Sequence, residues 1–227
     1  ATFIATSPDL KAWTRHYHTM GQSPICAAYD GVNYIFTVGT KAYRTTDFTS
    51  FVFYLTLPAS FQFLRKVNGI LFGLLYGSEC YTSTNGTTWT LRALPSTQSW
   101  RDVAWTGTKY VAVSSSTICA TSSDLLTWVA GGSIGAGGAG SIAYGAGTLV
   151  VAYSTNFSYS TDHGATWTTS TFPTMSAASS YDNVVWTGTK FMASSNGGAI
   201  AYATSVSGGT WSEVTNTAVG GQVGDST

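Results

Sequence analysis

The chain has 227 residues, a length that fits one large all-β domain or two small domains. Only 9% of the residues are Asp, Glu, Lys or Arg, against roughly 25% in an average soluble chain, so there are too few charges to cover the outer faces of several amphipathic helices. Ten basic residues balance ten acidic ones without any basic run, and no stretch of 18 apolar residues occurs. These features argue against helical bundles, a nucleic-acid partner and membrane insertion.

A polar turn closed by Trp or Phe recurs six times. The six copies are residues 7–13, 46–51, 83–89, 122–128, 160–167 and 205–211. The closing aromatic residues are 38, 38, 39, 39 and 44 positions apart. Five turns carry an Asp or Asn, which we expect to accept hydrogen bonds from backbone N–H groups of the turn, assisted by a preceding Ser or Thr. These residues are Asp9, Asp47, Asn85, Asp124 and Asp162. We expect each closing aromatic residue to pack against the neighbouring repeat.

A second pattern lies between these turns: a strand, a turn that contains Gly, and a second strand. The five copies are residues 28–34, 67–71, 104–110, 143–149 and 185–191. A third strand, such as residues 78–82, then leads into the polar turn, and a fourth strand begins at the Trp or Phe. Four short strands in every 38 to 40 residues predict the blades of an all-β propeller that occupies residues 1–227 as a single domain.

The pattern Ser/Thr-x-Asp-x-Gly-x-Thr-Trp, nearly complete at residues 160–167 and 83–89, resembles the Asp-box or BNR repeat. The interleaved Trp-Thr-Gly-Thr-Lys-aromatic elements at 105–110 and 186–191, with the low charge, are similar to propeller domains of bacteriophage tail fibres and spikes. The resemblance implies an extracellular domain on the virion surface, part of a longer virion protein. Its expected partner is a bacterial cell-surface glycan or receptor, and assembly of the virion would make it a homo-oligomer.

Both ends of the chain fall in the same blade when the repeats are aligned. Residue 1 corresponds to Ser116, between a second and a third strand, and residue 227 corresponds to Trp105, at the end of a first strand. We therefore expect residues 1–6 to pair with the C-terminal segment and residues 218–223 to supply an inner strand. This register favours six blades with one incomplete; the alternative is five blades plus an extra N-terminal hairpin.

Catalysis is not expected. A sialidase-like glycosidase, the alternative that Asp boxes suggest, needs an arginine cluster, a Tyr nucleophile assisted by Glu and an acidic proton donor. The chain has five Arg and only two Glu, Glu79 and Glu213, and it lacks the Phe-Arg-Ile-Pro element of that family. No cofactor or metal is predicted, because His16 and His18 have no third ligand at a recognisable spacing. The three cysteines, Cys26, Cys80 and Cys119, are expected to be buried free thiols.

A binding surface is predicted where most of the scarce charge gathers. The repeat register places Phe63, Trp100 and Tyr181 at equivalent positions on one face around the channel. The accompanying polar residues are Arg65, Arg101, Asp102 and Asp182, and nearby loops add Lys41, Glu79 and Asn196. Aromatic rings beside such groups can stack on a sugar and hydrogen-bond its hydroxyls. The alternatives are that the three aromatic residues pack between blades, and that the protein is a free lectin or a scaffold for protein partners.

Overall fold

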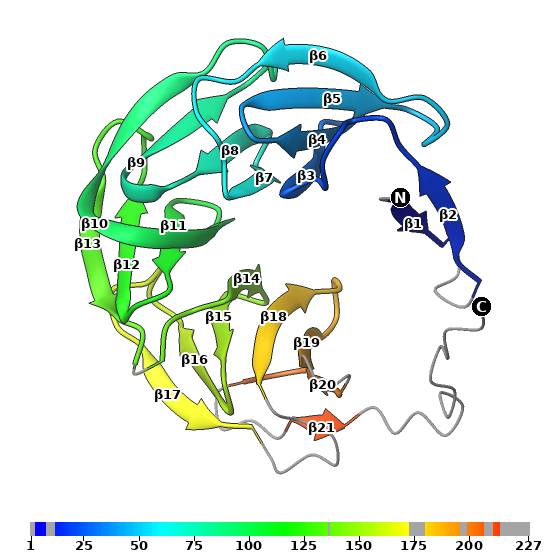
Figure 1. Cartoon of the computed structure of the whole chain (residues 1–227). Coiled ribbons are helices and arrows are strands. Elements are labelled where there is room, and N and C mark those ends of the chain that lie inside the picture. The colour runs from blue at the N-terminus through cyan, green and yellow to red at the C-terminus, as the bar shows by residue number, and fades with distance from the viewer. Residues whose placement is uncertain are drawn as a thin grey trace.

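The computed structural model describes residues 3–7, 12–135, 137–172, 180–195, 199–206 and 211–213, in which all regular secondary structure is β-strand. Figure 1 shows these strands grouped into small sheets that surround a common centre. The expectation of an all-β propeller is confirmed. None of the described residues belongs to a helix long and apolar enough to cross a membrane.

Three sheets have four antiparallel strands each, and a seven-stranded sheet divides at its long strand β10 into two further groups of four. We number these five blades 1 to 5 in chain order. Blade 1 contains β3 (Cys26–Tyr29), β4 (Tyr34–Val38), β5 (Lys41–Thr45) and β6 (Val52–Thr56). Blade 2 contains β7 (Phe63–Val67), β8 (Ile70–Leu74), β9 (Tyr76–Ser83) and the first part of β10 (Thr90–Trp105). The second part of β10 joins β11 (Tyr110–Ser114), β12 (Ile118–Ser122) and β13 (Val129–Ser133) to form blade 3.

Blade 4 contains β14 (Ser141–Gly145), β15 (Thr148–Tyr153), β16 (Asn156–Ser160) and β17 (Thr168–Thr171). Blade 5 contains β18 (Tyr181–Trp186), β19 (Phe191–Ser195), β20 (Ile200–Ala203) and β21 (Ser212–Glu213). A separate N-terminal hairpin pairs β1 (Phe3–Thr6) with β2 (Thr14–Tyr17). In each blade the first strand is innermost and the fourth forms the outer rim (Figure 1). Residues 218–223, which we expect to complete a sixth blade, lie outside the described residues, so the count of six stays a prediction.

The hydrophobic core is divided into clusters between adjacent blades. Successive side chains of a strand point to opposite faces of its sheet, so every blade can present apolar residues to both neighbours. Between blades 3 and 4, for example, Val111 and Val113 meet Leu149 and Val151. The closing aromatics pack into these clusters as expected, each toward the preceding blade: Trp89, Trp128, Trp167 and Trp211. Trp13 differs and is exposed, because no described sheet lies on that side of the N-terminal hairpin.

The polar turns have the predicted hydrogen bonds. In the turn of blade 2, the Ser83 hydroxyl accepts the N–H of Gly86 at 2.8 Å, and Asn85 Oδ1 accepts the N–H of Thr87 at 2.9 Å. The turns of blades 1, 3 and 4 repeat this arrangement around Asp47, Asp124 and Asp162. The N–H of Thr49 holds the pKa of Asp47 down at about 2. Asp9 and most of the 205–211 turn lie outside the described residues.

The cysteines are all free. Cys80 and Cys119 are buried, and burial raises the pKa of these thiols to about 12 and about 11. Cys26 is only half-buried, and it packs against the cluster between blades 1 and 2. The expectation of free thiols is confirmed, with Cys26 less enclosed than predicted. Thiols with such high pKa values are poor nucleophiles at neutral pH.

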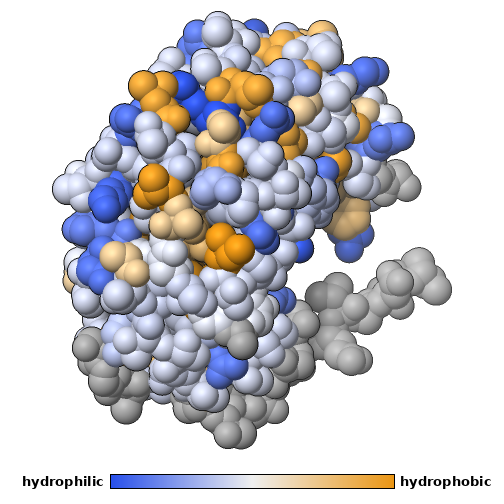
Figure 2. Space-filling model, turned by 90° about the vertical axis from the view of Figure 1, so that its left-hand side faces the viewer, coloured by the Kyte–Doolittle hydropathy of each residue, from blue (hydrophilic) through white to orange (hydrophobic). Residues whose placement is uncertain are grey.

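Figure 2 shows one side of the outer rim, where hydrophobic residues form separate patches among neutral and hydrophilic ones. Outer strands accordingly leave single apolar side chains in solvent, among them Leu91 and Val129. Isolated exposed hydrophobic residues are normal on a soluble domain and indicate no binding site.

Candidate functional site

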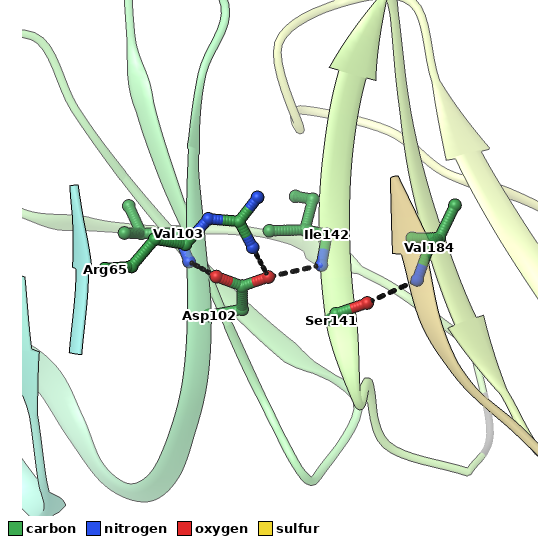
Figure 3. A network of polar contacts seen from close by, with 6 residues as sticks. All are labelled: Arg65, Asp102, Val103, Ser141, Ile142 and Val184. Carbon is green, nitrogen blue, oxygen red and sulfur yellow. Dashed lines mark hydrogen bonds and ion pairs between the residues drawn. The ribbon is translucent and has the colours of Figure 1, made fainter. Parts of the chain in front are cut away.

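A ladder of polar contacts connects the innermost strands of successive blades (Figure 3). Asp102, on β10, accepts the N–H of Val103 through Oδ1 at 2.8 Å and the N–H of Ile142 on β14 through Oδ2 at 3.0 Å. Oδ2 also forms an ion pair with Arg65 on β7. One carboxylate thus holds blades 2, 3 and 4 together.

Ser141 continues the ladder. Its hydroxyl accepts the N–H of Val184 on β18 at 2.7 Å, which connects blade 4 to blade 5. Asp102 and Ser141 occupy the same position in their blades, three residues before Trp105 and Tyr144, which begin the inner hairpins. Innermost strands have one edge without a neighbouring strand of their own blade, so their N–H groups need acceptors from elsewhere. The side chains of Asp102 and Ser141 supply these acceptors to the innermost strand of the next blade.

Asp102 has a structural role. Burial raises the pKa of Asp102, whereas the Arg65 guanidinium and the N–H groups of Ile142 and Val103 lower it; the net result is a pKa above the ordinary value. Both carboxylate oxygens are already engaged. The expectation that Asp102 offers a surface carboxylate to a ligand is therefore corrected, whereas its partner Arg65 keeps 39% of its side chain exposed.

A pairing irregularity occurs at the same place in β10 and β18. The register shifts between Trp100 and Asp102 in β10, and between Tyr181 and Asn183 in β18. Such a bulge adds one residue to a strand and redirects the side chains beside it. The added residues are Arg101 and Asp182.

The bulges turn Trp100 and Tyr181 into the core. Trp100 is fully buried and its indole N–H donates to the carbonyl of Gly77 at 3.0 Å. The ring of Tyr181 lies 4.2 Å, centroid to centroid, from that of Phe172 in the cluster between blades 4 and 5. The expectation that these two rings face a ligand is corrected in favour of the alternative: they pack between blades.

Beside the bulges lie two adjoining cavities of about 450 and 280 Å³, which we call together the central pocket. Innermost strands of all five blades contribute to its wall. Four of the predicted site residues line it with exposed or half-buried side chains: Phe63, Arg65, Arg101 and Asp182. The wall also includes residues for which the sequence predicted no ligand contact, among them Asn183, Ser115 and residues 137–140.

The central pocket combines several kinds of recognition group. The Arg101 guanidinium lies over the Phe63 ring, 5.3 Å from its centroid. The Asp182 carboxylate accepts the hydroxyl of Ser180 at 3.0 Å and is exposed. Gly138 lies so close to the backbone of Ser115, and Gly140 so close to the backbone of Asp182, that neither position has room for a Cβ atom. This arrangement provides a cation, a carboxylate, an amide and an aromatic ring around one hollow, a set that suits a polar organic ligand.

The remaining predicted residues lie elsewhere. Lys41 begins β5 and is exposed, and Glu79 is exposed on β9 opposite Ala93; neither lines the central pocket. Asn196 is outside the described residues. Among the described residues, no three His, Cys, Asp or Glu side chains are grouped so that they could hold a metal ion.

No family model matches the sequence, and no curated protein matches it. Among solved structures, the chain is similar to YCF48 bound to a D1 peptide, at 15% sequence identity and a TM-score of 0.60. The match covers 82% of this chain and 64% of the YCF48 chain, so this chain spans slightly less than two thirds of the length of YCF48. It is similar to a chain of a nidogen/laminin complex, at 9% identity and a TM-score of 0.63 over 84% and 79% of the two chains. It is also similar to a protein from Lactobacillus plantarum, at 11% identity and a TM-score of 0.61 over 93% and 76%. These likenesses agree with the strand order and place the protein in the class of β-propellers.

Proposed function

We propose that this propeller is a non-enzymatic receptor-binding domain of a phage spike or tail fibre, and that its central pocket binds a bacterial surface glycan. The observation that carries the proposal is the convergence of Arg101 on Phe63 beside Asp182 and Asn183 in a hollow walled by five blades. Sugar hydroxyls both donate and accept hydrogen bonds, and a guanidinium, a carboxylate and an amide meet both needs. The repeated Ser/Thr and Asp/Asn hydrogen bonds of the polar turns are those expected of an Asp-box repeat, and the proposal of a phage protein rests on the resemblance of the Trp-Thr-Gly-Thr-Lys-aromatic elements.

The carboxylates at the pocket favour binding over hydrolysis. A glycosidase needs two carboxyl groups, one to donate a proton and the other to act as nucleophile or base. Asp102 is held by Arg65 and two N–H groups and is buried, so it is not available to a sugar. Among the described residues that line the central pocket, Asp182 is then the one acidic side chain open to a ligand. A virion-surface location fits a domain that binds a glycan without cleaving it.

The proposal is tested with an array of purified bacterial lipopolysaccharides and capsular polysaccharides. We expect the wild type to bind at least one of them, and Arg101→Ala to lower that affinity at least tenfold, since a central contact is worth more than about 1.4 kcal/mol. The matched control is Arg44→Ala, because Arg44 also stacks on an aromatic ring, Tyr54, at 4.7 Å, but is not among the residues that line the central pocket. Equal loss in both variants, or release of reducing sugar by the wild type, would contradict the proposal.

A peptide ligand is the second candidate. One structural neighbour is described as bound to a peptide and another belongs to a complex between two proteins. The mixed polar and aromatic wall of the central pocket also suits a peptide with a charged side chain. Binding to arrayed peptides of bacterial outer-surface proteins, lost in Arg101→Ala and absent on every polysaccharide, would support this candidate.

A further inference from the structure

The smaller cavity of the central pocket contains two guanidinium groups. Arg65 and Arg101, two of the five arginines of the chain, both line this cavity of about 280 Å³. Phe63 and Arg65 are two residues apart on β7, so their side chains point to the same face of blade 2 and start about 6.6 Å apart along the strand. Arg101 of blade 3 lies over the Phe63 ring. Its guanidinium therefore reaches the part of the cavity that Arg65 also lines.

Both guanidinium groups keep N–H groups available to a ligand. Arg65 pairs with Asp102 through one terminal nitrogen, and Figure 3 shows its other terminal nitrogen pointing away from Asp102. Arg101 contacts the Phe63 ring and forms no hydrogen bond or ion pair with any other described residue. A guanidinium has five N–H donors in a rigid fork, so most donors of the two side chains are unused.

Positive charge exceeds negative charge in the smaller cavity. Its charged lining residues are Arg65, Arg101 and Asp102, and the single carboxyl group of Asp102 neutralises no more than one of the two cations. Like charges repel more strongly when partly shielded from water, and arginine, unlike lysine, does not lose its proton to relieve that repulsion. An anion bound between the two arginines relieves it. Asp182 lines only the larger cavity, which therefore has the opposite preference.

We infer that the glycan bound in the central pocket is acidic, and that Arg65 and Arg101 together bind its anionic group, a carboxylate or a phosphate, in the smaller cavity. This inference rests on the proposed function and adds the chemical class of the ligand. Arginine binds both anions through paired N–H···O hydrogen bonds. Asn183 lines both cavities and Asp182 the larger one, so these two residues are placed to bind hydroxyl groups of the same glycan.

The test uses the polysaccharides that the wild-type domain binds on the array. One sample of each is reduced so that its carboxyl groups become primary alcohols, and a second is treated with cold aqueous hydrofluoric acid to remove phosphate. We expect one treatment to lower the affinity at least tenfold, about 1.4 kcal/mol, and that treatment identifies the anion. Unchanged affinity after both treatments would overturn this inference and leave the proposed function standing. Absence of binding to every polysaccharide would overturn both.

Arg65→Lys tests the second guanidinium. The variant keeps a cation beside Asp102, so the ion pair between blades 2 and 3 is retained, but it removes the planar fork. We expect its affinity for the untreated polysaccharide to fall close to the wild-type affinity for the treated sample. Arg44→Lys is the matched control and should bind like the wild type, because Arg44 is not among the residues that line the central pocket. Wild-type affinity in Arg65→Lys would overturn the inference.

Arg101→Gln gives a reading that does not depend on the ion pair between the blades, since Arg101 takes no part in it. The variant should bind the untreated and the treated polysaccharide with equal affinity, because it lacks one of the two groups that hold the anion. Its thermal unfolding should match that of the wild type. A variant that still prefers the untreated polysaccharide at least tenfold would overturn the inference.

Discussion

Replacement of Asp102 by alanine should weaken the connection between three blades. The substitution removes the acceptor of the Val103 and Ile142 N–H groups, and both residues are fully buried. Each buried donor left without a partner costs about 1–3 kcal/mol, so the two together cost about 2–6 kcal/mol. Removing a buried carboxylate relieves its desolvation and offsets part of this cost. We expect a net loss of about 3 kcal/mol in the free energy of unfolding.

Urea denaturation followed by tryptophan fluorescence measures this loss. For a chain of this size, about 3 kcal/mol corresponds to a fall in Tm of roughly 6–12 °C. Asp182→Ala is the matched control, because Asp182 is an exposed carboxylate nearby that is bonded only to Ser180 among the described residues. It should change stability by no more than about 0.5 kcal/mol. If the two variants unfold alike, the ladder of inner-strand contacts does not hold the blades together.

Three other substitutions test the packing and the polar turns. Trp100→Ala should lower the free energy of unfolding by about 3–5 kcal/mol in the same urea assay, because it empties a fully buried site. A loss below about 1 kcal/mol would indicate that the Trp100 side chain is not buried. Tyr181→Phe should leave stability unchanged or raise it by up to about 1 kcal/mol, since the buried hydroxyl has no hydrogen-bond partner among the described residues; a clear loss would reveal one. The pKa of Asp47 is lowered to about 2, so this turn stabilises the fold above the ordinary Asp pKa near 4 and loses that contribution as pH falls through 2. Asp47→Asn should therefore reduce the loss of Tm between pH 4 and pH 2, and an unchanged pH profile would contradict the assigned hydrogen bonds.

The repeat predicted the fold because its determinants are local. Ser83 and Asn85 bond to N–H groups no more than three residues away, so the spacing of residue types is enough to predict the turn. The closing Trp residues were predictable for the same reason, since each stands at a fixed distance from its turn.

The candidate site was only partly predictable because it depends on non-local contacts. A one-residue bulge decides that Trp100 points into the core and brings Arg101 to the pocket, and the composition of β10 carries no signal for it. Asp102 is buried because Arg65 and the N–H of Ile142 reach it from other blades, each about 40 residues away in the chain. Asn183 could have been selected from its register, since it holds the position of Asp102 in blade 5.

A crystal structure of the domain with an oligosaccharide from the polysaccharide that it binds on the array tests the central claim most directly. The account predicts sugar density in the central pocket, with hydroxyl groups within hydrogen-bond distance of the Arg101 guanidinium and the Asp182 carboxylate. Sugar bound instead at the polar turns or on the outer rim, with the central pocket empty, would contradict it.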